Sequence, residues 1–465
     1  MGASCELCGS ALIFAGQKLG RLDREEFEGL PPGVWRYRAF LPEIDAEDVV
    51  TLGEGDTPLL SAKRLGKELG LSRLLIKDES RNPTGSFIDR GSTVLVSLAK
   101  RAGVTECSCV TTGNLGASLA AYCAKAGIGA RIRIHQNTDR GKLYQMLAYG
   151  AQIEAHTRRA DQLPSDSRFL SVTAANPFLL EGEKTTCFEV VQELGWKTPD
   201  VIVVPVGTGG HLSMIWRALV QLRESGLIDR SACRLLGVQF AGGAPIVNPV
   251  SSGGGPASAD SHFTELEESE PYFRTEAIKA ITASRGMGLV TTATETVRAT
   301  GLLARTEGIF AEPASASAVA SLDTAVKRGF VRGDDTVVCI ITGAGLKDTK
   351  AVIRLAKVTR RVSVEERYAL QTTQIGDTKL ALLRLIADRR RYGYELWRGL
   401  SLKRRITAAS VYQHLAELEG FGLVRRAALV SAKGRERVMY EPTKKGIDFM
   451  KMAEKLRRAS PPEAM

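Results

Sequence analysis

Short apolar runs alternate with helical stretches over residues 51–358. Runs rich in Val, Ile and Leu are typical of buried strands, and apolar residues spaced three and four apart are typical of the helices that cover them. This alternation predicts an α/β fold with a parallel sheet and crossover helices. The expected strands cover 74–76, 108–110, 131–134, 201–205, 235–238 and 336–341, and the expected helices cover 92–102, 118–126 and 212–222.

The pattern changes on both sides of this region. Residues 1–50 carry few periodic signals, and residues 242–258 are rich in Gly, Pro and Ser, which predicts a loop. Residues 359–376 form a polar linker, and residues 377–458 then follow the order helix, helix, helix, hairpin, helix. We therefore expect an N-terminal segment, an α/β body, a linker and a small C-terminal domain.

The composition fits a globular protein of two or three domains. Of the 465 residues, 44% are hydrophobic and 25% are charged, which is enough to bury a sizeable core. No apolar run approaches the ~20 residues that a membrane-spanning helix needs. The first residues also lack the basic-then-apolar order of a signal peptide. These features predict a cytoplasmic protein that has no membrane partner.

The positive charge is concentrated at the C-terminal end. The formal net charge is +11, and residues 376–465 hold 20 Lys and Arg against 10 Asp and Glu. A nearly neutral body with a basic terminal domain is expected when one module binds a polyanion such as DNA. A solubilising basic surface is the alternative, and charge alone does not separate the two.

The eight cysteines follow no disulfide framework, which is typical of a reducing compartment. Cys5 and Cys8 alone have the spacing of a metal-binding pair. A structural zinc site normally needs four ligands, and no second Cys-x-x-Cys pair follows. We therefore expect no zinc.

A glycine-rich segment, Gly207-Thr208-Gly209-Gly210-His211, lies between an expected strand and an expected helix. Glycines allow the backbone to approach an anion closely, and the N–H groups at the start of a helix supply donors and a positive dipole. The segment therefore has the character of a phosphate-binding loop. Taken alone, it also fits a tight turn.

Nine blocks in one order give this segment a context. One of them reads Asn82-Pro83-Thr84-Gly85-Ser86-Phe87-Ile88-Asp89-Arg90-Gly91. The others cover 52–59, 77–79, 112–114, 143–151, 176–182, 207–211, 308–316 and 342–348. Together they resemble threonine synthase, within the tryptophan-synthase-β-like, fold type II family of pyridoxal-phosphate enzymes. The resemblance covers residues 50–358 and implies a two-domain fold type II architecture.

The resemblance implies roles for several residues. Asn114 corresponds to the residue that contacts the pyridine 3′ oxygen, and Thr342 to the hydroxyl that bonds the pyridine nitrogen. Residues Gly207, Thr208, Gly209, Gly210 and His211 correspond to the loop that holds the cofactor phosphate. The implied substrate or effector cleft contains Ser86, Thr111, Thr112, Ala174 and Leu179.

The most important departure from the family pattern is Ile88. The family has lysine at this position, and that lysine forms the Schiff base and moves the proton at the substrate α carbon. Isoleucine has no nitrogen and no titratable group. Pyridoxal phosphate is then expected to bind non-covalently if it binds at all, and Lys77 on the same segment is a doubtful substitute because the family keeps both lysines.

Other departures affect the same chemistry. The family stretch Asn-Ser-x-Asn-Pro-x-Arg grips the substrate phosphate through its Ser and Arg, and Ala174 and Leu179 stand at those places. These side chains offer no donor to a dianion. The phosphate loop carries Thr208 and His211 where the family has asparagines, and Ala344 replaces a family histidine. The sequence therefore predicts that threonine synthesis is lost.

The C-terminal domain has a resemblance of its own. The segment Tyr392-Gly393-Tyr394-Glu395-Leu396, with segments 409–419, 422–424 and 440–446, resembles PadR-type winged-helix regulators over 378–450. Such domains place one helix in the major groove of DNA and a hairpin wing on the backbone. The implied DNA-contacting residues are Thr407, Ser410, Tyr412, Gln413, His414, Lys433, Arg435 and Arg437. A protein-contact module is the alternative.

These features lead to one main hypothesis and two alternatives. The main hypothesis is a catalytically impaired, threonine-synthase-like regulator that binds an amino acid or a phosphorylated effector and reads double-stranded DNA, as a homodimer. The second is an active pyridoxal-phosphate lyase or synthase with an appended winged helix. The third is an inactive subunit that modulates a genuine threonine synthase.

Overall fold

The computed structural model describes residues 12–15, 20–111, 113–135, 138–155, 168–229, 232–241, 243–250, 271–348, 375–402, 406–432 and 435–459. The chain divides into two compact units, residues 1–358 and residues 359–465. Each unit has hydrophobic clusters of its own. We refer to them as unit 1 and unit 2 and describe each separately.

The first part of unit 1 has little regular structure but is fixed by aromatic side chains. It contains three short 3₁₀ helices, η1 (Arg24–Phe27), η2 (Val34–Phe40) and η3 (Ala46–Asp48). Phe40 from η2 packs on Phe188, with ring centroids 4.5 Å apart. Burial of large aromatic rings therefore holds a segment that has no periodic pattern.

A six-stranded sheet forms the larger part of unit 1. Only its edge strand β1 is antiparallel to its neighbour, and the other strands are parallel, as the sequence predicts. In spatial order the strands are β1 (Leu59–Ser61), β2 (Arg73–Asp78), β10 (Thr336–Ile341), β7 (Val201–Pro205), β8 (Arg234–Phe240) and β9 (Met287–Thr291).

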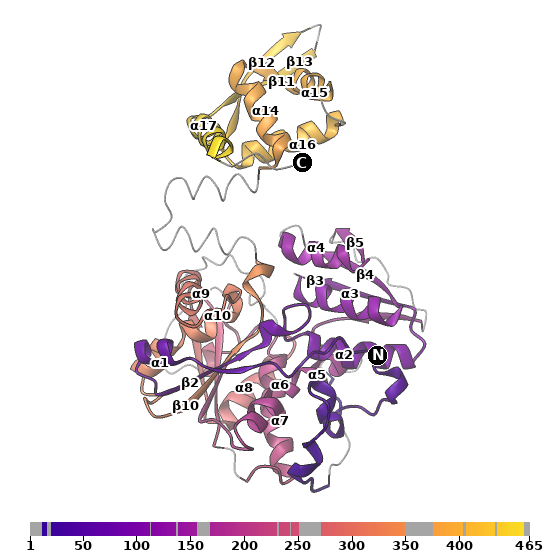
Figure 1. Cartoon of the computed structure of the whole chain (residues 1–465), viewed down its shortest axis with the longest axis vertical. Helices are drawn as coiled ribbons and strands as arrows, with labels where there is room; N and C mark the ends of the chain where they lie inside the picture. The colour runs from indigo at the N-terminus through magenta and orange to yellow at the C-terminus, as the bar shows by residue number, and fades with distance from the viewer. Residues whose placement is uncertain are drawn as a thin grey trace. The chain divides into compact units, whose positions relative to one another are not determined.

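Helices cover both faces of this sheet because its central strands are apolar on both sides (Figure 1). Along β7, Val201 and Val203 enter one hydrophobic cluster, and Ile202 and Val204 enter the other. The first cluster is completed by α1 (Lys63–Leu69), α9 (Ala293–Glu307), α10 (Pro313–Ala320) and α11 (Leu322–Lys327). The second is completed by α6 (Thr185–Glu193), α7 (Gly210–Glu224) and α8 (Arg274–Ala283).

A second, wholly parallel sheet has four strands and a core of its own. In spatial order the strands are β5 (Gln152–Ala155), β4 (Gly129–Ile134), β3 (Glu106–Thr111) and β6 (Phe169–Val172). The helices of this region are α2 (Asp89–Arg101), α3 (Asn114–Ala126), α4 (Arg140–Ala148) and α5 (Pro177–Glu183). The sequence pattern predicts β3 and β4 but not β5 or β6, which are strands of only four residues.

Unit 2 follows the predicted order of three helices, a hairpin and a final helix. The helices are α14 (Asp377–Asp388), α15 (Gly393–Ser401), α16 (Ala408–Gly420) and α17 (Lys444–Ala459), and the hairpin is β12 (Val424–Ala432) with β13 (Arg435–Pro442). A strand of two residues that was not predicted, β11 (Arg391–Tyr392), pairs with β13 and completes a three-stranded sheet. This arrangement is that of a winged helix.

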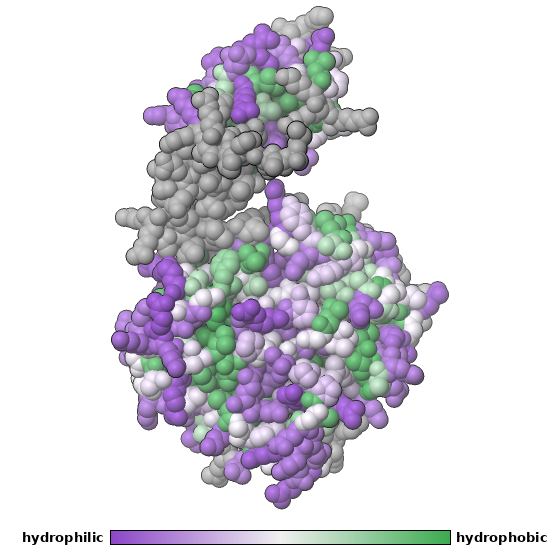
Figure 2. All heavy atoms as spheres, in the orientation of Figure 1, coloured by the Kyte–Doolittle hydropathy of each residue, from purple (hydrophilic) through white to green (hydrophobic). Residues whose placement is uncertain are grey.

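Hydrophobic residues appear in separate patches among hydrophilic ones on the face of the molecule in Figure 2. Among the described residues, none of the helices combines the length and the hydropathy that a bilayer crossing requires. Exposed apolar residues such as those in Figure 2 are ordinary on a protein surface and do not by themselves indicate a binding site.

Candidate functional site

The predicted site residues of unit 1 follow the carboxyl ends of parallel strands. The segment that carries Ile88 follows β2, Asn114 follows β3, and Thr342 follows β10. The glycine-rich segment 207–211 follows β7 and leads directly into α7. Ligands of open parallel sheets bind outside the carboxyl ends of the strands. This arrangement therefore defines the candidate site.

Ile88 immediately precedes α2, in right-handed helical conformation (φ −60°, ψ −24°). Its half-buried side chain packs against the hydrophobic cluster of the four-stranded sheet. Leu179 belongs to the same cluster, is 1% exposed, and lies over Gly91. Position 88 thus offers an apolar surface and no amine, and Leu179 is a core residue that faces α2.

The backbone around Ile88 is fixed from both sides. Phe87 N–H donates to the carbonyl of Thr342 at 3.0 Å, and Ser86 forms a bridge with Gly343. The segment between β2 and α2 is therefore joined to the end of β10. These contacts fix the position of the backbone at residue 88, so any side chain at this position starts from the same place in the site.

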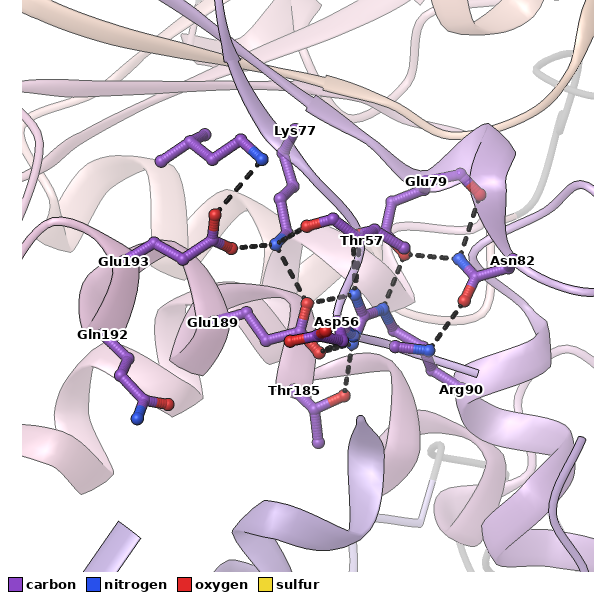
Figure 3. Close-up of polar contacts among 12 residues, drawn as sticks. Asp56, Thr57, Lys77, Glu79, Asn82, Arg90, Thr185, Glu189, Gln192 and Glu193 are labelled. Carbon is purple, nitrogen blue, oxygen red and sulfur yellow. Dashed lines mark hydrogen bonds and ion pairs between the residues drawn. The ribbon is translucent and has the colours of Figure 1, made fainter. Parts of the chain in front are cut away.

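A buried ion network anchors the start of α2 (Figure 3). Arg90, which is 0% exposed, donates from Nε to Glu79 and from Nη2 to Glu189, each at 2.6 Å. Burial acts to raise the pKa of both carboxyls, but the charge and hydrogen bonds of Arg90, together with the charge of Lys77, outweigh it, and the pKa of Glu189 falls to about 2. Arg90 also donates to Thr185 at 3.1 Å, so this network ties α2 to α6.

Lys77 belongs to the same network and is not a free amine. Its Nζ lies 2.9 Å from Glu189 and also pairs with Glu193, and it donates to the carbonyl of Thr57 (Figure 3). The side chain is fully buried. These partners engage the ammonium of Lys77 in the ion network.

The glycine-rich segment forms a turn with an open helix start. Gly209 has φ +88°, and a Cβ there would lie 2.9 Å from the carbonyl oxygen of Phe273 and 2.9 Å from Ile246. Only glycine fits this position without strain. The N-cap of α7 is Gly209, which has no side chain to cap the helix, and Gly210 N–H donates to Thr208 Oγ1 in a long contact of 3.4 Å. The start of a helix is suited to binding an anion through its N–H groups.

His211 lies in that first turn and is 7% exposed. Its ring stacks on Phe87, with centroids 4.3 Å apart and planes inclined by 19°. Neither ring nitrogen has a hydrogen-bond partner within the described part of the chain. Burial lowers the pKa of His211 to about 4, Glu79 opposes this, and Arg90 adds to it.

A second polar group surrounds Asn114, the first residue of α3. Its Nδ2 donates to Glu312 at 3.0 Å, and Lys142 Nζ lies 3.6 Å from the same carboxylate. The Oδ1 atom of Asn114 is buried and lacks a partner in the described residues. Neither Glu312 nor Lys142 was predicted from the sequence to be a site residue, although Glu312 stands inside one of the family-like blocks.

Two further buried ionisable groups flank Ile88. Lys347, at the end of η7 (Gly345–Lys347), donates to the carbonyl of Thr84 at 2.6 Å, and burial lowers its pKa to about 8. Asp89 accepts hydrogen bonds from Thr84 and from Ser118, and burial raises its pKa. The sequence did not single out either residue as part of the site.

The remaining predicted residues of unit 1 take different positions. Thr342 Oγ1 shares a hydrogen bond of 2.7 Å with Ser315, and Thr111 Oγ1 accepts from Gly113 N–H at 2.9 Å. Ala174 is half-buried just after β6, and Ser86 is fully buried. Thr112, Cys5 and Cys8 lie outside the described residues.

These residues fit a phosphorylated pyridine, but they do not fit its covalent attachment at position 88. A phosphate suits the glycine turn and the uncapped start of α7, where His211 holds two buried nitrogens without partners. A ring with polar substituents suits the unpartnered Oδ1 of Asn114 and the hydroxyl pair of Thr342 and Ser315. Buried polar atoms without partners are uncommon in folded proteins and point to a missing ligand or water.

The candidate nucleic-acid interface of unit 2 lies on α16 and the hairpin. Thr407 caps α16 by accepting from Ser410 N–H at 3.2 Å. Tyr412 is 50% exposed and Gln413 is exposed, whereas Ser410 and His414 are half-buried and their side chains lie 3.4 Å apart. On β13 the guanidinium of Arg437 stacks over Tyr392 at 4.3 Å. Lys433 and the side chain of Arg435 lie outside the described part of the chain.

Comparisons with known proteins bear on both units. Residues 50–343 match the family described as pyridoxal-phosphate dependent enzyme, and residues 382–452 match the transcriptional regulator PadR-like family. Threonine synthase of Methanocaldococcus jannaschii is 38% identical over an alignment of 369 residues, which covers 76% of this chain and 91% of that protein. Threonine synthase of Mycobacterium leprae is 40% identical over an alignment of 335 residues, which covers 70% of this chain and 91% of that protein.

Solved structures agree on the fold. The processed form of threonine deaminase isoform 2 from Solanum lycopersicum aligns with a TM-score of 0.54 at 17% identity, over 75% of this chain and 97% of that chain. A lysine-to-alanine mutant of O-ureido-L-serine synthase, with O-ureido-L-serine bound, aligns with a TM-score of 0.54 at 20% identity. This alignment covers 70% of this chain and 97% of that chain. The predicted fold class and family resemblance are confirmed. The chain belongs to the family of pyridoxal-phosphate-dependent enzymes that contains the threonine synthases, and it carries a PadR-like domain at its C-terminus.

Proposed function

We propose that the chain is a ligand-responsive DNA-binding regulator. In this proposal the threonine-synthase-like unit 1 binds an amino acid or a phosphorylated effector without an attached cofactor, and the PadR-like unit 2 binds double-stranded DNA. The observation that carries the proposal is Ile88, an apolar side chain at the position where the family has its lysine. The retained glycine turn, Asn114 and Thr342 support continued ligand binding.

The loss of the amine removes two functions at once. Pyridoxal phosphate, when bound, withdraws electrons from the α carbon of an amino acid, but a protein base must still move the proton there. General acid–base catalysis contributes about 10²–10⁴ in rate. Isoleucine supplies neither a proton acceptor nor an anchor, and the network of Figure 3 holds Lys77. This argument favours binding over turnover.

The argument for DNA binding rests on charge and on the exposed face of α16. Residues 376–465 hold 20 Lys and Arg against 10 Asp and Glu. Tyr412 and Gln413 stand exposed on the third helix of the unit, which is the helix that enters the major groove in winged-helix domains. A homodimer, which we also propose, would present two such helices to two half-sites.

The test of DNA binding is a titration of the full chain with a labelled duplex at several salt concentrations. Affinity should fall steeply with salt, because each neutralised phosphate contributes about −0.9 to the slope of log K against log salt. Arg437→Ala should weaken binding and reduce the slope by about one. Lys327→Ala is the matched control, since Lys327 is an exposed cation of unit 1 that pairs with Asp323. Binding that is absent, or insensitive to salt and to Arg437→Ala, contradicts the proposal.

An active pyridoxal-phosphate enzyme is the second candidate, and the retained polar groups around Asn114 and Thr342 favour it. Lys142 and Lys347 are the buried amines of this region. Borohydride reduction of cofactor-loaded protein, followed by peptide mass analysis, separates the candidates. The regulator predicts no cofactor mass on any lysine. A cofactor fixed to Lys142 or Lys347 would support the enzyme and remove the claim of non-covalent binding.

A further inference from the structure

We propose that His211 is a ligand-binding residue of the glycine turn, where its imidazole donates a hydrogen bond to a phosphate monoester at the start of α7 and takes up a proton from solvent as the ligand binds. This inference deepens the proposed function and rests on its claim that unit 1 holds a ligand. It assigns a phosphate-bearing ligand to the turn. It also makes the affinity for that ligand dependent on pH.

The geometry places the ring beside the anion site. His211 is the second residue of α7, directly after the glycines of the turn, and the N-cap Gly209 has no side chain to cap the helix, although Gly210 N–H has a long contact of 3.4 Å with Thr208 Oγ1. Its ring stacks on Phe87, whose backbone N–H is bonded to the carbonyl of Thr342. The imidazole therefore lies between the helix start and the segments that follow β2 and β10. Both nitrogens lack a partner among the described residues, so the ring retains two unused hydrogen-bonding positions.

Apolar groups line the glycines next to the ring. A Cβ at Gly210 would meet Leu180 of α5 at 2.6 Å, and a Cβ at Gly209 would meet Ala277 of α8 at 3.1 Å. Two charged side chains act on the imidazole, Glu79 of η4 (Glu79–Arg81), which favours the cation, and Arg90 of α2, which disfavours it. Because Arg90 holds Glu79 in the ion pair of Figure 3, that carboxylate gives His211 little net support.

A phosphate changes this balance. Without a ligand, burial keeps the imidazole neutral at physiological pH, since its pKa lies near 4. A dianion within hydrogen-bond reach strongly favours the protonated ring, which can then donate to the phosphate. The proton comes from solvent, so binding and proton uptake are linked. A neutral amide at position 211 could donate to the same phosphate without taking up a proton.

The experiment measures binding of pyridoxine phosphate, which has no aldehyde, to the full chain by calorimetry. Two buffers that differ in ionisation enthalpy report the protons taken up. We expect close to one proton per site, and a Kd that rises about fivefold to tenfold between about pH 6.5 and about pH 7.5, because one linked proton gives at most one decade per pH unit. Pyridoxine without phosphate should bind weakly and without this dependence.

Two variants complete the test. His211→Asn should still bind pyridoxine phosphate but lose the proton uptake and most of the pH dependence. His135→Asn, which removes another imidazole of unit 1, should behave as the wild type. If wild type and His211→Asn bind with the same pH dependence, the inference is overturned while the ligand-binding role stands. If none of the proteins binds pyridoxine phosphate at any pH, the inference is overturned together with the phosphorylated-effector form of the proposed function.

Discussion

At the scale of single residues, the proposed loss of catalysis rests on Ile88. The side chain belongs to an apolar cluster that also contains Leu179. The backbone that carries it is held by Phe87 and Ser86 against the end of β10. The substitution has therefore changed the chemical group at this place while the surrounding framework keeps its hydrogen bonds.

The variant Ile88→Lys should restore covalent attachment of pyridoxal phosphate. A lysine at the start of α2 would extend into a site whose glycine turn, Asn114 and Thr342 are in place. We expect a visible absorption band on addition of the cofactor and a borohydride-stable mass on residue 88. Ile88→Leu is the control, since it keeps an apolar side chain of the same size and should give neither signal. A colourless Ile88→Lys protein that remains folded would show that the pocket has lost more than the amine.

His211 should make the stability of unit 1 sensitive to acid. Its pKa is about 4 in the folded chain and about 6.5 in an unfolded one, so the unfolded chain binds the proton first as the pH falls. Stability is then lost between about pH 6.5 and about pH 4, by about 3 kcal/mol in total. Denaturant unfolding of the wild type and of His211→Asn at several pH values tests this. If the free energies of unfolding of the wild type and of His211→Asn change equally between about pH 6.5 and about pH 4, His211 is not the group responsible.

The sequence identifies some site residues and misses others for a physical reason. Ile88 and His211 stand in continuous motifs, so their positions can be predicted from neighbours in the chain. Glu312 contacts Asn114 across 198 positions, and only the folded sheet brings them together. No local pattern marks such a contact. The partnerless state of the His211 nitrogens likewise depends on the packing of Phe87.

At the scale of elements, the start of α2 depends on buried charges. Arg90 satisfies Glu79 and Glu189 from two different elements, and Lys77 completes the network. A buried ion pair does not guarantee stability in itself, but removing one partner leaves an uncompensated charge. The position of residue 88 therefore depends on the ion pairs of its neighbours at the start of α2, and not on contacts of residue 88 itself.

The variant Arg90→Met should destabilise unit 1 by about 3–5 kcal/mol, because it leaves the buried carboxylate of Glu79 without its cation and leaves Glu189 with Lys77 alone. Lys327→Ala is the control. Lys327 also pairs with a carboxylate, Asp323 at 2.6 Å, but the two side chains are 73% and 60% exposed, and an exposed pair contributes at most about 1 kcal/mol. Denaturant unfolding measures both. Equal losses in the two variants would mean that the network of Figure 3 has no special role.

The elements that the sequence predicts are those with strong periodic patterns. All six expected strands and all three expected helices of unit 1 are present. The strands that were missed are β1, β5, β6 and β9, which have three to five residues. In β1 two of three side chains are exposed, and β9 contains a glycine where Val247 approaches closely. Their pairing with neighbours, and not their own composition, makes them strands.

At the scale of the whole molecule, the chain joins two units that have separate cores. The described core of unit 2 contains residues from α14, α15, α16 and α17, and none of its members comes from unit 1. Each unit therefore has the packing that it needs to unfold as a cooperative body of its own. Any communication between a ligand in unit 1 and DNA on unit 2 must change an equilibrium that both units share.

Calorimetry of the full chain should consequently show two unfolding transitions. Pyridoxine phosphate at about 100 times its Kd should stabilise unit 1 by about 2.7 kcal/mol and leave the transition of unit 2 in place. A DNA duplex should stabilise unit 2 and leave the transition of unit 1 in place. A single transition that both ligands shift together would instead indicate that the two units unfold as one body.

The burial of the Arg90 network has a practical consequence for experiments on gene control. Dissolved ions weaken attractions that pass through water, with a Debye length of about 10 Å at 0.1 M, but they hardly reach charges enclosed in a protein interior. Arg90 and Lys77 are both 0% exposed. Added electrolyte should therefore dissociate the chain from DNA while the interior ion pairs of unit 1 persist. Protein eluted with salt should remain folded and bind DNA again once the salt is removed.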